Sequence, residues 1–227
     1  MFGRIAWDRR AVGRYAHRHL AFSRWVFPSL LLQIFQTNFL FFLVPRFFGE
    51  ETVGLLRVAE NLKNITNVVL IGLQNYVPPR AAACFSRDGY AALQQFVFKI
   101  GIVGVAPLIL FTLVMIVFGE PILAVLFGDP YRAAYAYLII FCIARVLGFV
   151  GECYSFMLLS IEMTRAFFWN HLVGFVLVLG AGIGAMPILG PLTVPLVFTV
   201  KALVNIVVQG WFLRGYRRRT VLVGRLR

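Results

Sequence analysis

The stretch IGIVGVAPLILFTLVMIVF, residues Ile100–Phe118, contains no charged side chain. A helix needs about 20 mostly apolar residues to cross the hydrocarbon layer of a bilayer, so this stretch predicts a transmembrane helix. Four further apolar stretches and a more polar one are long enough to do the same, at residues 25–45, 52–78, 133–160, 167–188 and 194–213. The predicted fold class is an all-α integral membrane protein, a bundle of six transmembrane helices.

Composition supports this class. The chain has 227 residues, of which 60% are hydrophobic and 23 are Phe, and its mean hydropathy is +0.83. These values exclude an ordinary soluble globular domain. The net charge of +13 would suit a nucleic-acid partner, but the cations gather at the ends of the apolar stretches, where anionic lipid headgroups attract them. We therefore expect a membrane partner and no nucleic acid.

The distribution of the basic residues predicts the orientation. Six Arg precede Trp25, six follow Leu213, and four basic residues fall in connections on the same side, whereas the opposite connections hold only Arg46 and Arg132. Cytoplasmic segments carry the excess of Lys and Arg, so both termini are predicted to be cytoplasmic. Residues 1–24 resemble an interfacial helix or a solvated linker, and residues 214–227 form a basic cytoplasmic tail.

The stretch 52–78 carries one polar face if it forms a single helix. At 100° per residue its polar side chains fall within an arc of roughly 160°. They are Arg57, Glu60, Asn61, Lys63, Asn64, Asn67, Gln74 and Asn75. Pro78 and Pro79 are expected to end this helix, because proline lacks the amide donor and disfavours helix in the residue before it. The pattern is typical of a helix that lines a cavity, although ion pairing among Arg57, Glu60 and Lys63 alone would also explain the charges.

Three other apolar segments carry polar residues at helical spacing. Arg145 and Glu152 are seven residues apart, Lys201, Asn205 and Gln209 follow at steps of four, and the first segment adds Ser29, Gln33 and Gln36. Such faces either surround a hydrated space or form hydrogen bonds between helices. The four cations Arg57, Lys63, Arg145 and Lys201 exceed the two carboxylates, so a cavity is expected to prefer an anionic ligand.

The carboxylates Glu60 and Glu152 are candidates for ion coupling, but each has a basic residue at pairing distance, which favours a neutralised structural group. The three Cys and three His show no metal-ligand spacing, and no nucleophile motif or Gly-rich phosphate loop is present. We therefore expect no cofactor, no metal and no enzymatic activity.

Three stretches resemble the polysaccharide biosynthesis and O-antigen flippase branch of the multidrug/oligosaccharidyl-lipid/polysaccharide exporter superfamily. The first is FGEETVGLLRVAENLKNITNVVLIGLQNYVPPRAA (Phe48–Ala82), with its Gly-acidic turn and its closing Asn-x-x-Pro. The second is FGEPILAVLFGDPYRAAYAYL (Phe118–Leu138), and the third is the small loop and Gly-rich helix within Leu159–Phe198. Each pattern alone has low specificity, and the resemblance depends on the order and spacing of all three.

The resemblance implies the second of the two six-helix bundles of such an exporter, with a partner bundle in another chain or in a second copy. Members of the family move an oligosaccharide linked to a polyprenyl pyrophosphate across the bacterial inner membrane, for lipopolysaccharide and other surface polysaccharides. By resemblance Arg57, Arg145 and Lys201 would bind phosphate, while the cavity candidates Lys63, Asn64, Asn67 and Asn205 would complete the site. The competing interpretation is a non-transporting membrane scaffold or a truncated remnant.

Overall fold

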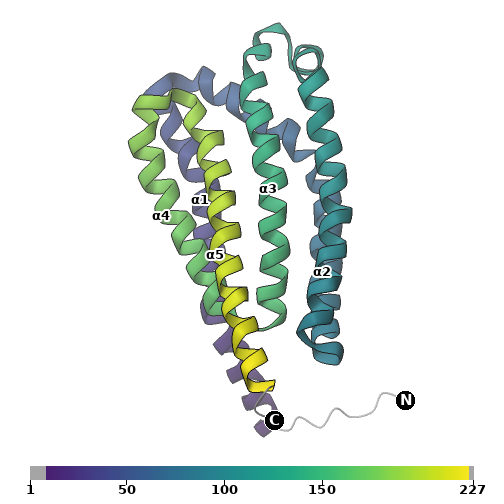
Figure 1. The fold of residues 1–227 in the computed structure, drawn as a ribbon. Helices are drawn as coiled ribbons and strands as arrows, with labels where there is room; N and C mark the ends of the chain where they lie inside the picture. Colours follow the sequence, from purple (N-terminus) through teal and green to yellow (C-terminus); the bar gives the residue numbers. More distant parts are fainter. Residues whose placement is uncertain (1–8, 225–227) are drawn as a thin grey trace, which may run out of the picture.

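The chain folds into helices throughout the part described by the computed structural model, residues 9–224. The elements are α1 (Arg9–Asn64), α2 (Asn67–Phe127), η1 (Asp129–Ala134), α3 (Tyr135–Ser160), α4 (Thr164–Leu189), η2 (Gly190–Leu192) and α5 (Thr193–Gly224). The all-helical class is therefore confirmed. Most of the helices lie roughly along one long axis, the part of α1 after Gly49 crosses the bundle obliquely, and α1 begins at the same end at which α5 finishes (Figure 1).

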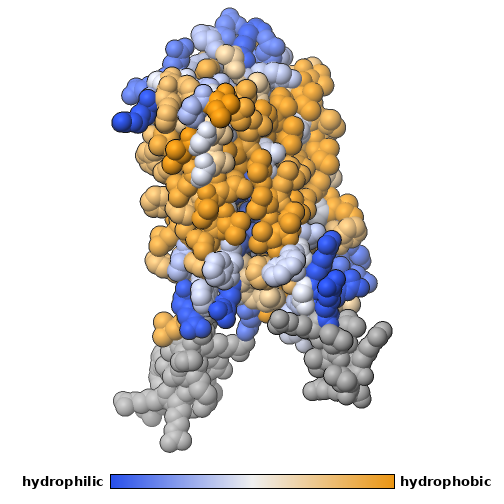
Figure 2. Space-filling model, turned by 60° about the vertical axis from the view of Figure 1, so that its left-hand side comes forward, coloured by the Kyte–Doolittle hydropathy of each residue, from blue (hydrophilic) through white to orange (hydrophobic). Residues whose placement is uncertain are grey.

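Four stretches of the described chain are helical, long and apolar enough to cross a membrane, and this indicates a membrane-embedded protein. They are Ser23–Asn64, Asn67–Phe127, Asp129–Ser160 and Thr164–Arg218. A broad hydrophobic band lies between more hydrophilic ends of the surface (Figure 2). The expected count of six separate transmembrane helices is not supported, because helical structure continues through several predicted connections.

Glycine, not proline, interrupts the long helices. Pro78 and Pro79 were expected to end a helix, but both lie inside α2, which instead breaks at Gly89 with φ 78°. The left-handed φ costs glycine little because it has no Cβ. Val77 and Ala81, on either side of the prolines, are fully buried, and this packing holds the helix together where two amide donors are missing.

The prediction of a single helix over residues 52–78 is also wrong. Its residues are divided between α1 and α2 by a turn at Ile65 and Thr66, so the expected polar face does not run unbroken. The break at Gly49, with φ 78°, falls where the sequence predicted a connection between residues 45 and 52. The predicted connections before residues 133, 167 and 194 also coincide with real helix ends within a few residues.

At the amino-terminal end, residues 9–24 form the first turns of α1 without a break before the apolar segment. The predicted interfacial segment 1–24 is therefore continuous with the membrane-length helix over this part, and residues 1–8 lie outside the described range. The predicted tail 214–227 continues α5 as far as Gly224.

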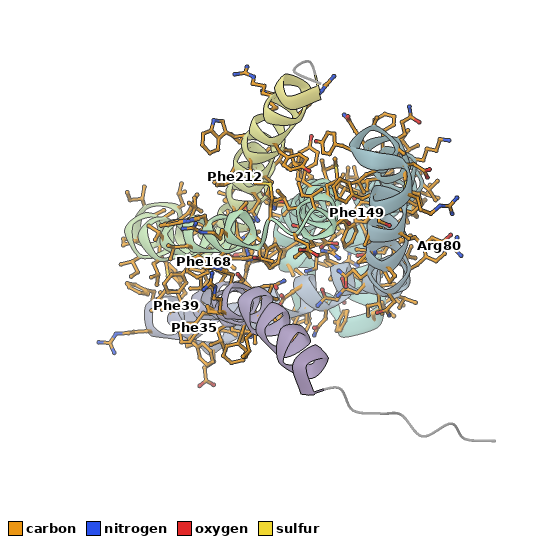
Figure 3. The ribbon with its side chains drawn as sticks, turned by 90° about the horizontal axis from the view of Figure 1, so that it is seen from below. Phe35, Phe39, Arg80, Phe149, Phe168 and Phe212 are labelled. Atoms are coloured by element: carbon orange, nitrogen blue, oxygen red, sulfur yellow. The ribbon has the colours of Figure 1, made fainter. Side chains whose placement is uncertain are left out.

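Two apolar cores hold the bundle together. One draws residues from all five α-helices around residues such as Leu40 and Phe141, and the other joins α2, α3, α4 and α5 around Phe149. The second core fixes the two arms of α2 on either side of Gly89 against each other, since Gly104 in the second arm lies against Leu73 of the first. Viewed from below, Phe149 lies within the bundle while Arg80 points away from it (Figure 3).

Candidate functional site

A polar cavity of about 450 Å³ lies between the helices, with lining residues from all five. Its charged lining consists of Glu60, Lys63, Arg145, Glu152 and Lys201. Its polar lining consists of Gln33, Thr37, Gln74, Ser155, Asn170, His171, Asn205 and Gln209. The structure thus brings Lys63, Glu60, Arg145, Glu152, Lys201 and Asn205 together, as part of the predicted site.

Two lysines lie on either side of an aromatic pair in this cavity. The Nζ of Lys63 is 5.8 Å from the ring centroid of Phe141, and the Nζ of Lys201 is 5.8 Å from that of Phe198. The two rings are themselves 6.0 Å apart, centroid to centroid. An ammonium near an aromatic face is attracted by the ring quadrupole at this distance. The rings therefore hold both lysines at the cavity wall without neutralising their charge.

The other charged groups of the cavity are paired. Arg145 Nη1 donates to Glu152 Oε1 at 2.9 Å, and the Gln74 amide donates to the second oxygen of the same carboxylate at 3.3 Å. Arg57, from outside the lining, donates to Glu60 at 2.9 Å. Among the described residues, Lys63 and Lys201 make no ion pair. They leave the cavity with two uncompensated positive charges.

Several buried polar atoms around the cavity have no hydrogen-bond partner within the described part of the chain. They are Gln36 Oε1, Arg145 Nε, Asn170 Oδ1, His171 Nδ1 and Asn205 Oδ1. Buried polar groups in proteins nearly always find a partner in protein or water. These atoms are consequently available to water or to a bound molecule, and most of them accept hydrogen bonds.

Sequence reasoning did not select Asn170 and His171 as site residues. Both are buried on α4, and the backbone carbonyl of His171 accepts a hydrogen bond from the side-chain amide of Gln36 on α1. They form an isolated pair in an apolar segment rather than a stripe with helical spacing, so no periodic signal identifies them. A polar pair within an otherwise apolar membrane helix is the signal that was available.

Three predicted cavity residues lie elsewhere. The side chain of Arg57 is 42% exposed and its guanidinium carbon lies 3.8 Å from the ring centroid of Phe41. Asn64 and Asn67 flank the turn between α1 and α2, where the Asn67 amide donates to the Asn64 side-chain oxygen at 3.1 Å. None of the three lines the polar cavity. Arg57 is held by Glu60 and Phe41 outside the lining, Asn64 is held at the end of α1 by its hydrogen bond with Asn67, and Asn67 begins a new helix after the break.

Comparison with known proteins identified no similar protein. No protein-family model, curated protein or solved structure matches the chain.

Proposed function

We propose that the chain is one half of a membrane flippase that moves a lipid-linked oligosaccharide, with its anionic pyrophosphate in the polar cavity. The observation that carries the proposal is the pair of uncompensated lysines, Lys63 and Lys201, in a cavity between membrane-length apolar helices. Buried cations within a membrane are costly and mark sites for ions or substrates. An ammonium that lacks a carboxylate partner favours an anionic ligand.

The neutral polar groups of the cavity suit the sugar part of such a cargo. Asn170, His171 and Asn205 each present a buried acceptor without a partner. A sugar offers many hydroxyl donors, and satisfying buried acceptors with them avoids the penalty for an unpaired group. In the proposed complex the two lysines bind the diphosphate, and these acceptors bind hydroxyl groups beside it.

The proposed topology gives the bundle six passes through the bacterial inner membrane. The arms of α2 on either side of Gly89 would each cross the membrane, as would α4 and α5 on either side of the η2 turn. Because α1 begins where α5 ends, an even number of passes places both ends on one side (Figure 1). The excess of Arg near both ends makes that side the cytoplasm.

A second bundle is proposed to cover the polar face. Gln33, Asn61, Gln74 and Asn75 are exposed although they lie within stretches long enough to span a membrane. Amide side chains facing hydrocarbon lose their hydrogen bonds with water, which is costly. A separately encoded bundle or a second copy of this chain would enclose the cavity and allow the two halves to rock around the cargo.

The proposal is tested with a polyprenyl diphosphate carrying a short fluorescent oligosaccharide. Binding is measured for the purified protein, alone and together with the product of its neighbouring reading frames, and translocation is measured in liposomes with a membrane-impermeant quencher. Lys63→Gln and Lys201→Gln are each expected to weaken binding by about 10- to 150-fold, since one charge-assisted hydrogen bond contributes about 1.5–3 kcal/mol. Arg80→Gln is the matched control because Arg80 points away from the bundle (Figure 3).

Equal binding by the two lysine variants and the control would refute the assigned role of the cavity. Binding without translocation, in every combination of partners, would favour the non-transporting scaffold. The uncharged polyprenol is a further control, because it lacks the diphosphate that the lysines are proposed to hold.

A further inference from the structure

A second and larger hollow, of about 930 Å³, follows the outside of the bundle. We refer to it as the apolar groove. Its walls are the second arm of α2, from Tyr90 to Ile109, and the α5 residues from Ile206 to Arg217, while α3 forms the floor. Figures 1 and 3 show α3 between α5 and α2, which do not pack along each other. Glycines at positions 101 and 210 keep the groove open, because each lacks a side chain where it faces α3.

The groove is apolar along its length and basic at one end. Phe98, Ile102, Val207 and Trp211 are exposed along its rim, and each would face hydrocarbon in a bilayer. Arg214 and Arg217 lie at the end nearest the carboxyl terminus of α5, where Tyr90 also lines the groove and its ring centroid is 5.5 Å from that of Tyr216. None of the described residues that line the groove is acidic. The lining is thus complementary to a hydrocarbon chain with an anionic headgroup.

The length of the α5 wall fits a lipid of a single leaflet. From Ile206 to Arg214 this wall spans about 12 Å at the helical rise of 1.5 Å per residue, and the α2 wall, from Tyr90 to Ile109, continues past it. One leaflet contributes about half of the roughly 30 Å hydrocarbon core. A headgroup phosphate beside Arg214 therefore places one acyl chain along the apolar part of this wall.

The apolar groove is separate from the polar cavity. No described residue lines both, and α3 divides them: Arg145 and Glu152 face the cavity, whereas Val150, Cys153 and Met157 face the groove. A molecule with its phosphate beside Lys63 or Lys201 would not place its tail in the groove without passing α3. The occupant of the groove is accordingly a lipid of the surrounding bilayer and not the molecule held in the cavity.

We propose that the apolar groove binds one anionic phospholipid from the leaflet at the terminal end of the bundle, with its phosphate on Arg214 and Arg217. The site does not depend on the function proposed for the polar cavity, because the two share no residue.

Native mass spectrometry of the purified full chain tests the headgroup part of the site, with phosphatidylglycerol and phosphatidylcholine added in turn. The wild type is expected to retain one phosphatidylglycerol molecule in preference to phosphatidylcholine. The double variant R214Q/R217Q is expected to lose about 25-fold in that preference, at about fivefold for each basic residue at an anionic surface. The double variant R80Q/R165Q removes the same charge outside the groove and is expected to keep the preference.

Filling the groove tests the chain part of the site. Gly101→Leu places a side chain at the groove wall, and its Cβ has the Cys153 sulfur as an ordinary neighbour at 3.7 Å, so the first carbon of the side chain fits without a clash. The variant is expected to lose the retained lipid, whereas Gly180→Leu, at an open helix position outside the groove, keeps it. A photoactivatable phosphatidylglycerol should crosslink to peptides from the groove in the wild type only.

Three lipid-binding results would overturn the proposal. They are equal retention of the two phospholipids by the wild type, retention of phosphatidylglycerol by Gly101→Leu, and tighter binding of a polyprenyl phosphate than of phosphatidylglycerol in the groove. A crosslinked dimer that buries residue 101 would also overturn it, because a protein helix would then occupy the place assigned to lipid.

Discussion

Replacing Gly104 with Ala tests the close packing of the second arm of α2 on α3. An ideal Cβ at this position lies 2.3 Å from Phe149 Cζ, 2.5 Å from Phe149 Cε1 and 2.9 Å from Leu73 Cδ1. Favourable contacts between carbon atoms are about 3.5–4.0 Å, so the ring of Phe149 has to move by about 1 Å or more. Phe149 is fully buried, so its ring has to move against packed neighbours.

Two effects of opposite sign determine the stability of the Gly104→Ala variant. Inserting a methyl group into a packed core costs about 1–3 kcal/mol, while Gly to Ala in a helix interior gains about 1 kcal/mol. Gly180→Ala is the matched control, because it has the same helical gain and no neighbour within 4 Å of the added carbon. The difference between the two variants isolates the steric cost, and we expect Gly104→Ala to be less stable than Gly180→Ala by about 1–3 kcal/mol.

Thermal unfolding in detergent, followed with a thiol-reactive fluorophore, measures this difference, since Cys142 and Cys153 are buried in the folded chain. A difference of 1 kcal/mol corresponds to about 2–4 °C for a chain of this length. Phe149→Leu removes the clashing ring carbons, so it is expected to cost less in the Gly104→Ala background than in the wild type. Equal unfolding midpoints for the Gly104→Ala and Gly180→Ala variants, or an equal cost of Phe149→Leu in both backgrounds, would refute the packing argument.

Three further predictions concern other parts of the bundle. E152A is expected to lower the free energy of unfolding by about 1–3 kcal/mol. This is less than the 3–5 kcal/mol lost when a fully buried pair is broken, because the Arg145 and Glu152 side chains are 18% and 27% exposed. The double variant R145M/E152L should recover most of this loss, and no recovery would contradict the pairing. Gly89→Ala is expected to lower the free energy of unfolding by about 1–2 kcal/mol, because alanine is strained at a φ of 78°. Gly72→Ala in the same helix should be neutral or stabilising. If the Gly89→Ala variant had the higher unfolding midpoint of the two, the helix break would lie elsewhere. Cys84 is expected to react with maleimide in the folded protein before the buried Cys142 and Cys153 do. Peptide mass spectrometry measures the order of labelling, and simultaneous labelling of all three cysteines would contradict the packing.

Spacing along single helices was the reliable guide to the cavity. Arg145 and Glu152, and likewise Lys201 and Asn205, belong to one face by helical geometry alone, and the structure brings both faces to the polar cavity. Such predictions need only the helix to be real and unbroken. They failed for Asn67 because the turn after Asn64 rotates the following helix, and local sequence gives no proline or glycine there to indicate it.

Helix limits were harder to predict because proline and glycine each have two roles in membrane helices. Pro107 and Pro121 lie within α2, as do Pro78 and Pro79, since packed neighbours sustain the helix despite the missing donors. The break occurs at Gly89, whereas Gly72 in the same helix continues without interruption. Which glycine takes the left-handed φ depends on how the two arms of α2 pack, and that information is not local.

Helix α3 separates the polar cavity from the apolar groove, and adjacent residues along it line different spaces. Glu152 contacts the polar cavity and Cys153 the apolar groove. A helix moves as a stiff rod, so any displacement of α3 that accommodates a lipid chain on one side changes the width of the cavity on the other. On the two proposals above, a lipid chain held in the groove and an anion held in the cavity are thereby coupled through the position of α3.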